Sequence, residues 1–585
     1  MSNKLVSLYR ARLAREKGAI RKEWGGRTSM ALVYPNYYRI GMSNLGFQIA
    51  YHLLNRREDV VAERVFLPEN KEMSLHLKNG KGLLSMESLS PLHRFDLIAF
   101  SLSFENDYPN ILTILHLGKI PLLSEERDDA RPMIMAGGIT TFMNPEPLAA
   151  FFDFFLLGEA EAVLDPFLDL FSEIKHIHQK KEDLLRNLTR NIQSLYVPSF
   201  YSVEYHKDGT IASREPTEDG IPEKIKVRCQ DLQAVPVNTS KILAPETEFA
   251  DRILIELGRG CGRSCRFCAA GYVYRPPRVR EEVELRSCVE KLLEETDRVG
   301  LLSACVSDTP GIENLTGVIA KKGATFSVSS LRADSITRPL VEHLKHVGQK
   351  TLAIAPEAGS ERLRKVINKH LRHDQIIHAV RLIAGTGDFG LRLYFLIGLP
   401  TETRGDVSEI LELVKSIKHH VVKESSTRGK IGQIRLTVNC FVPKPFTPFQ
   451  WFPLEDVTSL KEKQKWLKKA VVREGGVKVN FDVPKWAYVQ TLLSTGDRRV
   501  ASILKLAHQL DQDWVKAFRF SEVNPDFFVH RPKGLGETLP WDFIDHGIYR
   551  EHLIKEYELA LEGVESDVCD IGACERCGVC ATRPL

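Results

Sequence analysis

The segment from residue 251 to residue 450 alternates between apolar runs of strand length and stretches with the spacing of an amphipathic helix. Several of the helical stretches stop at glycine, which favours the end of a helix. Six apolar runs occur in this segment, at residues 252–260, 301–310, 324–335, 351–360, 390–400 and 432–445. Strands that alternate with helices form a parallel sheet with right-handed crossovers, which leaves few folds open to this part of the chain.

These six strand–helix units predict an incomplete (β/α)6 TIM-type barrel over residues 248–455. The strands are almost continuously apolar, as expected for a sheet that is covered on both faces. In barrels of this kind the chemistry takes place at the carboxyl ends of the strands. The loops that follow the strands are therefore the first place to search for a functional site.

A second α/β pattern precedes the barrel and predicts a doubly wound, Rossmann-like domain over residues 28–189. Five apolar runs alternate here with helical stretches, and several end in glycine, which lets a ligand approach the backbone closely. The other expected parts are an N-terminal helix in 1–27, a β-hairpin linker with a Lys-Asp-Gly turn in 190–247, a mainly helical region in 456–566 and a cysteine-rich tail in 567–585.

Charge and hydropathy exclude some classes of protein. The net charge of +4 is too small to indicate binding to nucleic acid or membranes by itself. The N-terminus lacks the apolar run of a secretory signal, and no apolar stretch is long enough to predict a membrane span. We therefore expect a cytoplasmic protein with reduced thiols, in which eleven cysteines indicate metal or redox chemistry. Four scattered cysteines are expected to be small buried apolar residues: Cys229, Cys288, Cys305 and Cys440.

Three other cysteines, Cys261, Cys265 and Cys268, lie in one short loop after the first barrel strand. Disulfide pairing would leave one thiol over, and structural zinc would need a fourth ligand from elsewhere. Three thiolates fit an iron–sulfur cluster in which one iron keeps an open coordination position. An open metal position is where a substrate or cofactor binds.

The spacing C-x3-C-x2-C, with Phe267 before the last cysteine and a strand before the first, resembles the radical S-adenosylmethionine (radical SAM) superfamily. The resemblance covers about residues 250–450. It implies that Cys261, Cys265 and Cys268 bind a [4Fe–4S] cluster and that SAM chelates the remaining iron. It further implies an enzyme that cleaves SAM reductively to a 5′-deoxyadenosyl radical, which abstracts hydrogen from a substrate.

The same resemblance assigns SAM contacts to the ends of other strands. Phe267 is expected near the adenine, and Ile397 and Gly398 are expected to approach the adenine ring. Glu357 is expected at the polar groups of SAM, with Arg362 nearby. Without the cysteines, the preferred interpretation of Glu357 would be a solvated carboxylate at a helix N-terminus. Gly398 is equally compatible with a simple turn.

The chain departs from the superfamily after the second barrel strand, where the usual Gly-Gly-Glu is missing. The sequence there offers Ser307 or Asp308 as a substitute contact for the amino group of SAM. Glu402, which follows the fifth strand, is a further candidate.

The N-terminal domain resembles the domain that precedes the barrel in cobalamin-binding radical SAM enzymes. Gly137 and Gly138 follow one strand and Gly158 follows the next. Ser101 and Ser103 resemble the serine-bearing strand end that lines the nucleotide tail of cobalamin.

One feature of the cobalamin class is missing. The class often ligates cobalt with the histidine of an Asp-x-His-x-x-Gly loop, but the corresponding stretch here, residues 34–48, has no histidine. His52 lies further on and is expected on a helix surface. The sequence therefore predicts either cobalamin without a histidine lower ligand or a degenerate domain that binds no corrin.

The second group of cysteines, Cys569, Cys574, Cys577 and Cys580, lies in the C-terminal tail. Four thiols at this spacing fit a tetrahedral zinc ion or a second iron–sulfur cluster, and the short spacing favours the cluster. A frayed tail with free thiols is the remaining alternative. With the stretches YRIGMSNLGFQ and LPWDFIDHG, the tail also resembles a full-length radical SAM family with a C-terminal four-cysteine motif.

Three hypotheses of function follow. The first is a radical SAM enzyme that methylates an unactivated carbon with cobalamin. The second is a radical SAM enzyme that modifies RNA or protein without cobalamin, as methylthiotransferases do, which leaves nucleic acid open as a partner. The third is a non-enzymatic iron–sulfur or zinc protein. The enzyme hypotheses imply a reducing partner such as flavodoxin or ferredoxin, and the sequence indicates no particular substrate.

Overall fold

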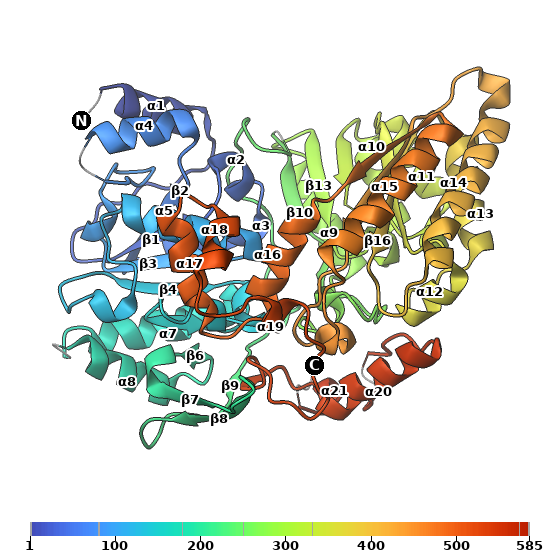
Figure 1. Ribbon diagram of the computed structural model, residues 1–585. Coiled ribbons are helices and arrows are strands. Elements are labelled where there is room, and N and C mark those ends of the chain that lie inside the picture. Colours follow the sequence, from blue (N-terminus) through green and yellow to red (C-terminus); the bar gives the residue numbers. More distant parts are fainter. Residues whose placement is uncertain are drawn as a thin grey trace.

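The computed structural model describes residues 3–79, 82–177, 180–249, 251–329, 331–571 and 574–582. An N-terminal α/β domain and a partial barrel stand next to each other, and the C-terminal segment runs over both of them (Figure 1). No helix within the described ranges is long and apolar enough to cross a membrane.

The N-terminal domain is built on one twisted sheet with the strand order β2-β1-β3-β4-β5-β6. Its first five strands are parallel, as the sequence predicts, and β6 adds an antiparallel edge. Every position of β1 and β2 is buried, because helices cover both faces of the sheet. The strands are β1 (Thr28–Tyr34), β2 (Val60–Phe66), β3 (Leu97–Ser101), β4 (Met133–Gly137), β5 (Phe154–Leu156) and β6 (Leu195–Tyr196).

The strands β2 and β3 lie on opposite sides of β1, and the connections to them leave a crevice at the carboxyl end of β1. The chain moves from β1 to β2 on one side and returns to β3 on the other, which is the arrangement of a doubly wound fold. In such folds ligands bind at this switch point. The helices of the domain are α1 (Asn3–Arg15), α2 (Tyr38–Gly41), α3 (Leu45–Arg56), α4 (Asn70–Asn79), α5 (Tyr108–Leu117), α6 (Ile139–Met143), α7 (Ala160–Ile174) and α8 (Lys181–Asn191).

The linker contains the hairpin that the sequence predicts. Strands β7 (Tyr201–Tyr205) and β8 (Ile211–Pro216) are antiparallel. Gly209 of the Lys-Asp-Gly turn has φ +88°, a left-handed conformation that favours glycine. Further along, β9 (Ile225–Lys226) pairs with β19 (Ile544–Asp545), which ties the linker to the C-terminal segment.

The barrel consists of two parallel sheets joined by a single bridge between Leu331 and Ile354. One sheet has the order β10-β13-β14 and the other β15-β16-β17-β18. Six of these strands correspond to the predicted ones, but β13 lies earlier than the predicted run 301–310 and shares only two residues with it. The structure adds a seventh strand, β18, inside the region expected to be mainly helical. The strands are β10 (Ile253–Glu256), β13 (Arg298–Leu302), β14 (Thr325–Val328), β15 (Thr351–Glu357), β16 (Gly390–Ile397), β17 (Ile434–Cys440) and β18 (Val477–Phe481); a separate ribbon joins β11 (Gly258–Arg259) to β12 (Arg278–Val279).

Helices follow the barrel strands as predicted and form its outer layer (Figure 1). The amphipathic pattern of each helix places its apolar residues against the sheet. These helices are α9 (Glu282–Leu292), α10 (Ile312–Lys321), α11 (Arg338–His346), α12 (Glu361–Val366), α13 (His373–Thr386), α14 (Arg404–Ser425) and α15 (Val457–Glu474).

The C-terminal segment fastens the barrel to the N-terminal domain. Asn144 of the N-terminal domain donates to the carbonyls of Ser494 and Gly496 at 3.0 and 2.8 Å, and Lys444 after β17 pairs with buried Glu105 at 2.6 Å. Buried contacts of this kind fix the orientation of the N-terminal domain relative to the barrel. The remaining helices are α16 (Pro484–Thr495), α17 (Val500–Gln509), α18 (Trp514–Phe520), α19 (Asp526–Val529), α20 (Arg550–Glu562) and α21 (Val579–Thr582).

Candidate active site between the barrel and the N-terminal domain

The three-cysteine loop begins where β11 ends, at the carboxyl end of the first barrel strand. Gly260 turns the chain with φ +83°, and a Cβ at this position would lie 2.7 Å from the Tyr274 carbonyl oxygen. The loop then folds on itself, because the Cys268 amide donates to the Cys265 carbonyl at 3.1 Å. Cys265 is buried, while Cys261 and Cys268 are half-buried. The loop therefore lies at the strand ends, where the sequence predicts the site.

The thiols of this loop are unfavourable as free thiolates. Burial, and then the neighbouring thiols Cys265 and Cys261, raise the pKa of Cys268 to about 12. Burial and Cys265 also raise the pKa of Cys261. A thiolate is stable here only beside a positive charge such as iron, so the donor set fits a cluster. Among the described residues, no three His, Cys, Asp or Glu side chains surround a position for one metal ion. Cluster thiolates each bind a different iron and are spaced more widely than the ligands of one ion.

Two cations that the sequence did not point to face the cysteine loop, half-buried Arg332 and buried Lys369. Burial opposes the charge of Arg332, but its hydrogen bond to Asp334 and the Cys265 thiol raise its pKa. Burial likewise opposes the charge of Lys369, whose pKa is raised by Glu357 and Cys265. Arg332 follows β14 and Lys369 follows α12, so two further strand–helix units direct positive charge toward the cluster position.

Glu357 ends β15 in a strained conformation. Its φ of +66° lies in the left-handed region that few residues other than glycine adopt, and the strand register shifts there. Its carboxylate pairs with the Lys369 ammonium at 3.2 Å. Glu357 is therefore held at the mouth of the barrel beside the cysteine loop, instead of lying free in solvent. Its predicted contact with SAM stays a prediction.

At the end of β16, Gly398 also has a left-handed conformation, with φ +78°. Its amide donates to the carboxylate of Glu402 at 2.9 Å, and Glu402 pairs with Lys463 at 2.6 Å. Glu402 thus closes the turn after the strand. Ile397 is completely buried in the strand itself. Arg362 is half-exposed and pairs with Asp406.

Ser307 and Asp308 hold the cysteine loop to its neighbours. Both carboxylate oxygens of Asp308 accept from Arg263 of the loop at 2.7 Å. The Ser307 hydroxyl accepts from the Arg332 amide at 3.1 Å. The residues that replace the usual Gly-Gly-Glu therefore position the loop, and their contact with the amino group of SAM stays a prediction.

Phe267 packs into a small apolar cluster that is separate from the main core. Its neighbours come from the ends of three strands, where Ala358 follows β15, Leu399 follows β16 and Phe441 follows β17. Such an apolar surface beside the cysteine loop suits a nucleobase, as the sequence analysis expects.

A cavity of about 460 Å³ opens between the sheet of the N-terminal domain and the barrel. All five predicted residues of the N-terminal domain line it: Ser101, Ser103, Gly137, Gly138 and Gly158. The carboxyl end of β1 lines it as well, so the cavity lies at the switch point of the doubly wound sheet. Gly138 has φ +112°, and a Cβ there would lie 2.3 Å from the Leu102 carbonyl oxygen.

The opposite wall of this cavity belongs to the barrel and reaches the cysteine loop. Gly260 and Ala270 line the cavity and flank the loop on either side. The residues that line the cavity, all within the described ranges, include no histidine. His52 lies on α3, and burial, then Lys241 and Arg56, lower its pKa.

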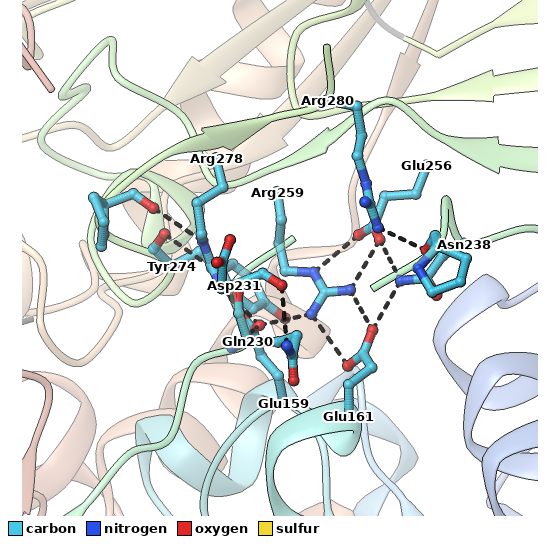
Figure 2. A network of polar contacts seen from close by, with 12 residues as sticks. Glu159, Glu161, Gln230, Asp231, Asn238, Glu256, Arg259, Tyr274, Arg278 and Arg280 are labelled. Atoms are coloured by element: carbon cyan, nitrogen blue, oxygen red, sulfur yellow. Dashed lines mark hydrogen bonds and ion pairs between the residues drawn. The ribbon is translucent and has the colours of Figure 1, made fainter. Parts of the chain in front are cut away.

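A network of charged side chains joins the base of the cysteine loop to the N-terminal domain (Figure 2). Arg259 pairs with Glu159 at 2.7 Å, with Glu161 at 2.8 Å and with Glu256 at 2.9 Å. Glu159 also pairs with Arg278 at 2.6 Å. Figure 2 shows Arg259 between these carboxylates, with Asn238 bridging Glu161 and Glu256. The network fixes the cavity wall and the cysteine loop in one rigid arrangement.

The scattered cysteines are only partly as expected. Cys305 and Cys440 are buried, but Cys229 and Cys288 are half-buried. Cys288 lies on the helix α9 and Cys229 lies in the linker near Arg278, where the chain is less densely covered.

Comparison with known proteins agrees with this site. The family model for the radical SAM superfamily matches residues 255–414, and the model for the N-terminal part of radical SAM proteins matches residues 46–198. An uncharacterised protein of Methanocaldococcus jannaschii is 29% identical over 481 residues, which is 81% of this chain and 90% of that protein. The ribosomal protein uS12 methylthiotransferase RimO of Petrotoga mobilis is 24% identical over 187 residues, or 30% of this chain and 42% of the relative.

Solved structures with a similar arrangement are also found. The radical SAM methyltransferase TsrM from Kitasatospora setae, with cobalamin and a [4Fe–4S] cluster bound, is 13% identical with a TM-score of 0.46, covering 73% of this chain and 77% of that one. The cobalamin-dependent radical SAM enzyme OxsB is 13% identical with a TM-score of 0.43, covering 84% and 67%. With its cysteine loop at the barrel mouth and its match to the radical SAM family model over residues 255–414, the chain contains a radical SAM domain.

Proposed function

We propose that this radical SAM protein is a cobalamin-dependent enzyme that methylates an unactivated carbon. The observation that carries the proposal is the cavity between the N-terminal domain and the barrel. Residues at the switch point of the N-terminal domain line one side of it, and residues that flank the cysteine loop line the other. Its volume lies in the range of cofactor sites, roughly 300–1,000 Å³. When bound, the cluster with SAM supplies hydrogen abstraction from carbon, and cobalamin supplies the methyl group.

The residues around the cysteine loop would bind and orient SAM. Cys261, Cys265 and Cys268 would hold the cluster, and Lys369 and Arg332 would offset the negative charge of the thiolates. The strand end at Glu357 would present a carboxylate to the polar groups of SAM, and the apolar surface around Phe267 would accept its adenine.

The residues of the cavity fit a corrin cofactor that has no protein histidine below it. Ser101 and Ser103 offer hydroxyl groups at the end of β3, and the Ser103 hydroxyl is already oriented by a 2.8 Å hydrogen bond with Tyr34. Gly137, Gly138 and Gly158 let a nucleotide tail approach the backbone. The walls are otherwise mainly apolar, as the rim of a macrocycle requires.

The competing function is sulfur insertion into RNA or protein without cobalamin. The likeness to methylthiotransferases supports it, since two such relatives are 22–24% identical over parts of the chain. This alternative predicts no corrin in the cavity. Either function requires a low-potential one-electron donor, for which flavodoxin or ferredoxin is the proposed partner.

The experiment is a corrin-binding assay with a cavity-filling variant. Ala50 of α3 lines the cavity and His52 of the same helix does not, so Ala50→Trp and His52→Trp form a matched pair. We expect purified wild type and His52→Trp to take up one cobalamin per chain, seen as corrin absorbance and cobalt content, and Ala50→Trp to take up at least tenfold less with unchanged iron. Equal uptake by all three, or none by the wild type, would overturn the proposal.

A further inference from the structure

The C-terminal tail lies directly on the three-cysteine loop. The amide of Cys569 donates to the carbonyl of Gly262 at 2.8 Å, and Gly262 immediately follows the first cysteine of the loop. Asn368 joins the same two segments, because its side chain donates to the Ser264 carbonyl at 3.2 Å and accepts from the Ser566 amide at 3.0 Å. The two cysteine groups of the sequence, about three hundred residues apart, are therefore neighbours in space.

An arginine inside the three-cysteine motif anchors this contact. Arg266 is fully buried and pairs with Glu556 of α20 at 3.0 Å. It also donates to the Val564 carbonyl at 2.8 Å, at the start of the tail. A buried arginine needs partners for its donors, so the position of the tail is specified by the same motif that builds the first site.

Three of the four thiols of the tail lie on one tight turn. The Arg576 amide donates to the Cys574 sulfur at 3.4 Å, and the Gly578 amide donates to the Glu575 carbonyl at 3.2 Å. Cys577 is buried with 4% of its surface exposed, and its carbonyl accepts from the Tyr549 amide at 2.9 Å. Gly578 packs its backbone against the Tyr549 ring, where a Cβ would lie 2.5 Å from the ring. The turn that carries the thiols is thus seated on α20.

A second buried arginine joins the first loop to the helix that carries the tail. Arg275 donates to the Ser264 hydroxyl at 2.9 Å and to the Gly271 carbonyl at 2.7 Å, both in the first loop. Its third nitrogen contacts the His552 ring of α20 at 3.2 Å. One cation therefore contacts both the first loop and the helix on which the tail is seated.

We propose that Cys569, Cys574, Cys577 and Cys580 bind a second [4Fe–4S] cluster, held beside the first. Four thiolates complete the coordination of such a cluster, which leaves no open iron. The short spacing of the four cysteines, and their contact with a loop that itself calls for a cluster, favour the cluster over tetrahedral zinc.

The test is iron, sulfide and zinc analysis of the full chain after anaerobic reconstitution. We expect about eight irons in the wild type and about four in each of two variants, Cys574→Ser/Cys577→Ser and Cys261→Ala/Cys265→Ala/Cys268→Ala. Cys288→Ser, in the half-buried cysteine of α9, is the matched control and should keep the wild-type content. One zinc and no iron in the triple variant would overturn the proposal, as would unchanged iron in the tail variant.

Electron paramagnetic resonance tests whether the two proposed clusters lie next to each other. The reduced wild type should show an electron paramagnetic resonance spectrum broadened by coupling between two paramagnets, and each variant should show one isolated signal. The single variant Cys574→Ser, in a half-buried thiol at the edge of the tail, guards against misfolding and should give the same uncoupled spectrum. Two uncoupled signals in the wild type would contradict the placement. Because these readouts require neither SAM turnover nor cobalamin, they can fail while the proposed function stands.

Discussion

Arg259, which lies two residues before the first cysteine of the loop, pairs with Glu159 of the N-terminal domain at 2.7 Å. Glu159 is 3% exposed in its side chain and also pairs with Arg278 of the barrel. One carboxylate of the N-terminal domain thus fixes two arginines that flank the cysteine loop. The geometry of the barrel mouth and that of the cavity are set together.

Glu159→Gln is expected to destabilise the protein by roughly 3 kcal/mol, since removing one partner of a buried ion pair leaves uncompensated charge. The measurement is the free energy of unfolding in urea. Glu290→Gln, at an exposed pair with Arg286 on α9, is the control and should cost at most about 0.5 kcal/mol. Equal effects of the two substitutions would show that the network contributes no more than a surface pair.

Acid should weaken the contact between the N-terminal domain and the C-terminal segment through Glu146. Burial opposes ionisation of Glu146, but Arg214 and Arg498 lower its pKa to about 2. A carboxyl group whose pKa is lower in the folded than in the unfolded state stabilises the native state at pH values above its unfolded pKa of about 4.3. This stabilisation is lost as the pH falls toward 2. The expected contribution is roughly 3 kcal/mol. The stability difference between wild type and Glu146→Gln should therefore shrink between pH 4.5 and 2. A difference that does not change with pH would contradict this account.

Arg332→Met should make the first cluster harder to reduce. A unit positive charge about 8 Å from a redox centre, at an effective dielectric constant of about 20, favours the added electron by about 2 kcal/mol. We expect the midpoint potential to fall by on the order of 50–100 mV in a redox titration of the tail variant Cys574→Ser/Cys577→Ser, which isolates the first cluster. Arg332→Lys should restore most of the wild-type potential. An unchanged potential in Arg332→Met would place the charge too far away to matter.

Glu556→Gln should loosen the tail, because it removes the charged partner of fully buried Arg266. The expected cost is roughly 3 kcal/mol, together with faster limited proteolysis of the segment after α20. Glu558→Gln, at an exposed position of the same helix, is the control. Wild-type proteolysis in Glu556→Gln would mean that backbone contacts alone hold the tail.

Much of the fold is visible in the sequence because periodicity reports burial. The six predicted barrel strands are long, apolar and followed by helices, so their order and direction follow from handedness. Strand β18 was missed because its alternating residues are half-buried or exposed, and it follows a helix inside a helical region. The edge strand β6 has only two residues and gives no periodic signal.

Site residues that belong to one short sequence motif could be predicted. Site residues that come together from distant segments could not. The spacing of Cys261, Cys265 and Cys268 identifies the loop in the sequence. The resemblance to cobalamin-binding enzymes identifies the glycines and serines of the cavity. Nothing in the local sequence marks Arg332 or Lys369, which acquire their role by facing the loop from other strand–helix units. The hydrogen bond between the Cys569 amide and the Gly262 carbonyl joins two segments that are about three hundred residues apart in the sequence. Only the folded chain brings them together.

The most direct test of the account is whether reduced, reconstituted protein releases 5′-deoxyadenosine from SAM, measured by liquid chromatography under anaerobic conditions. The account predicts release by the wild type and by Cys288→Ser, and a loss of at least a hundredfold in Cys265→Ala, which removes a proposed cluster ligand. Undiminished release by Cys265→Ala, or none by the iron-loaded wild type in the presence of a reductant, would contradict it.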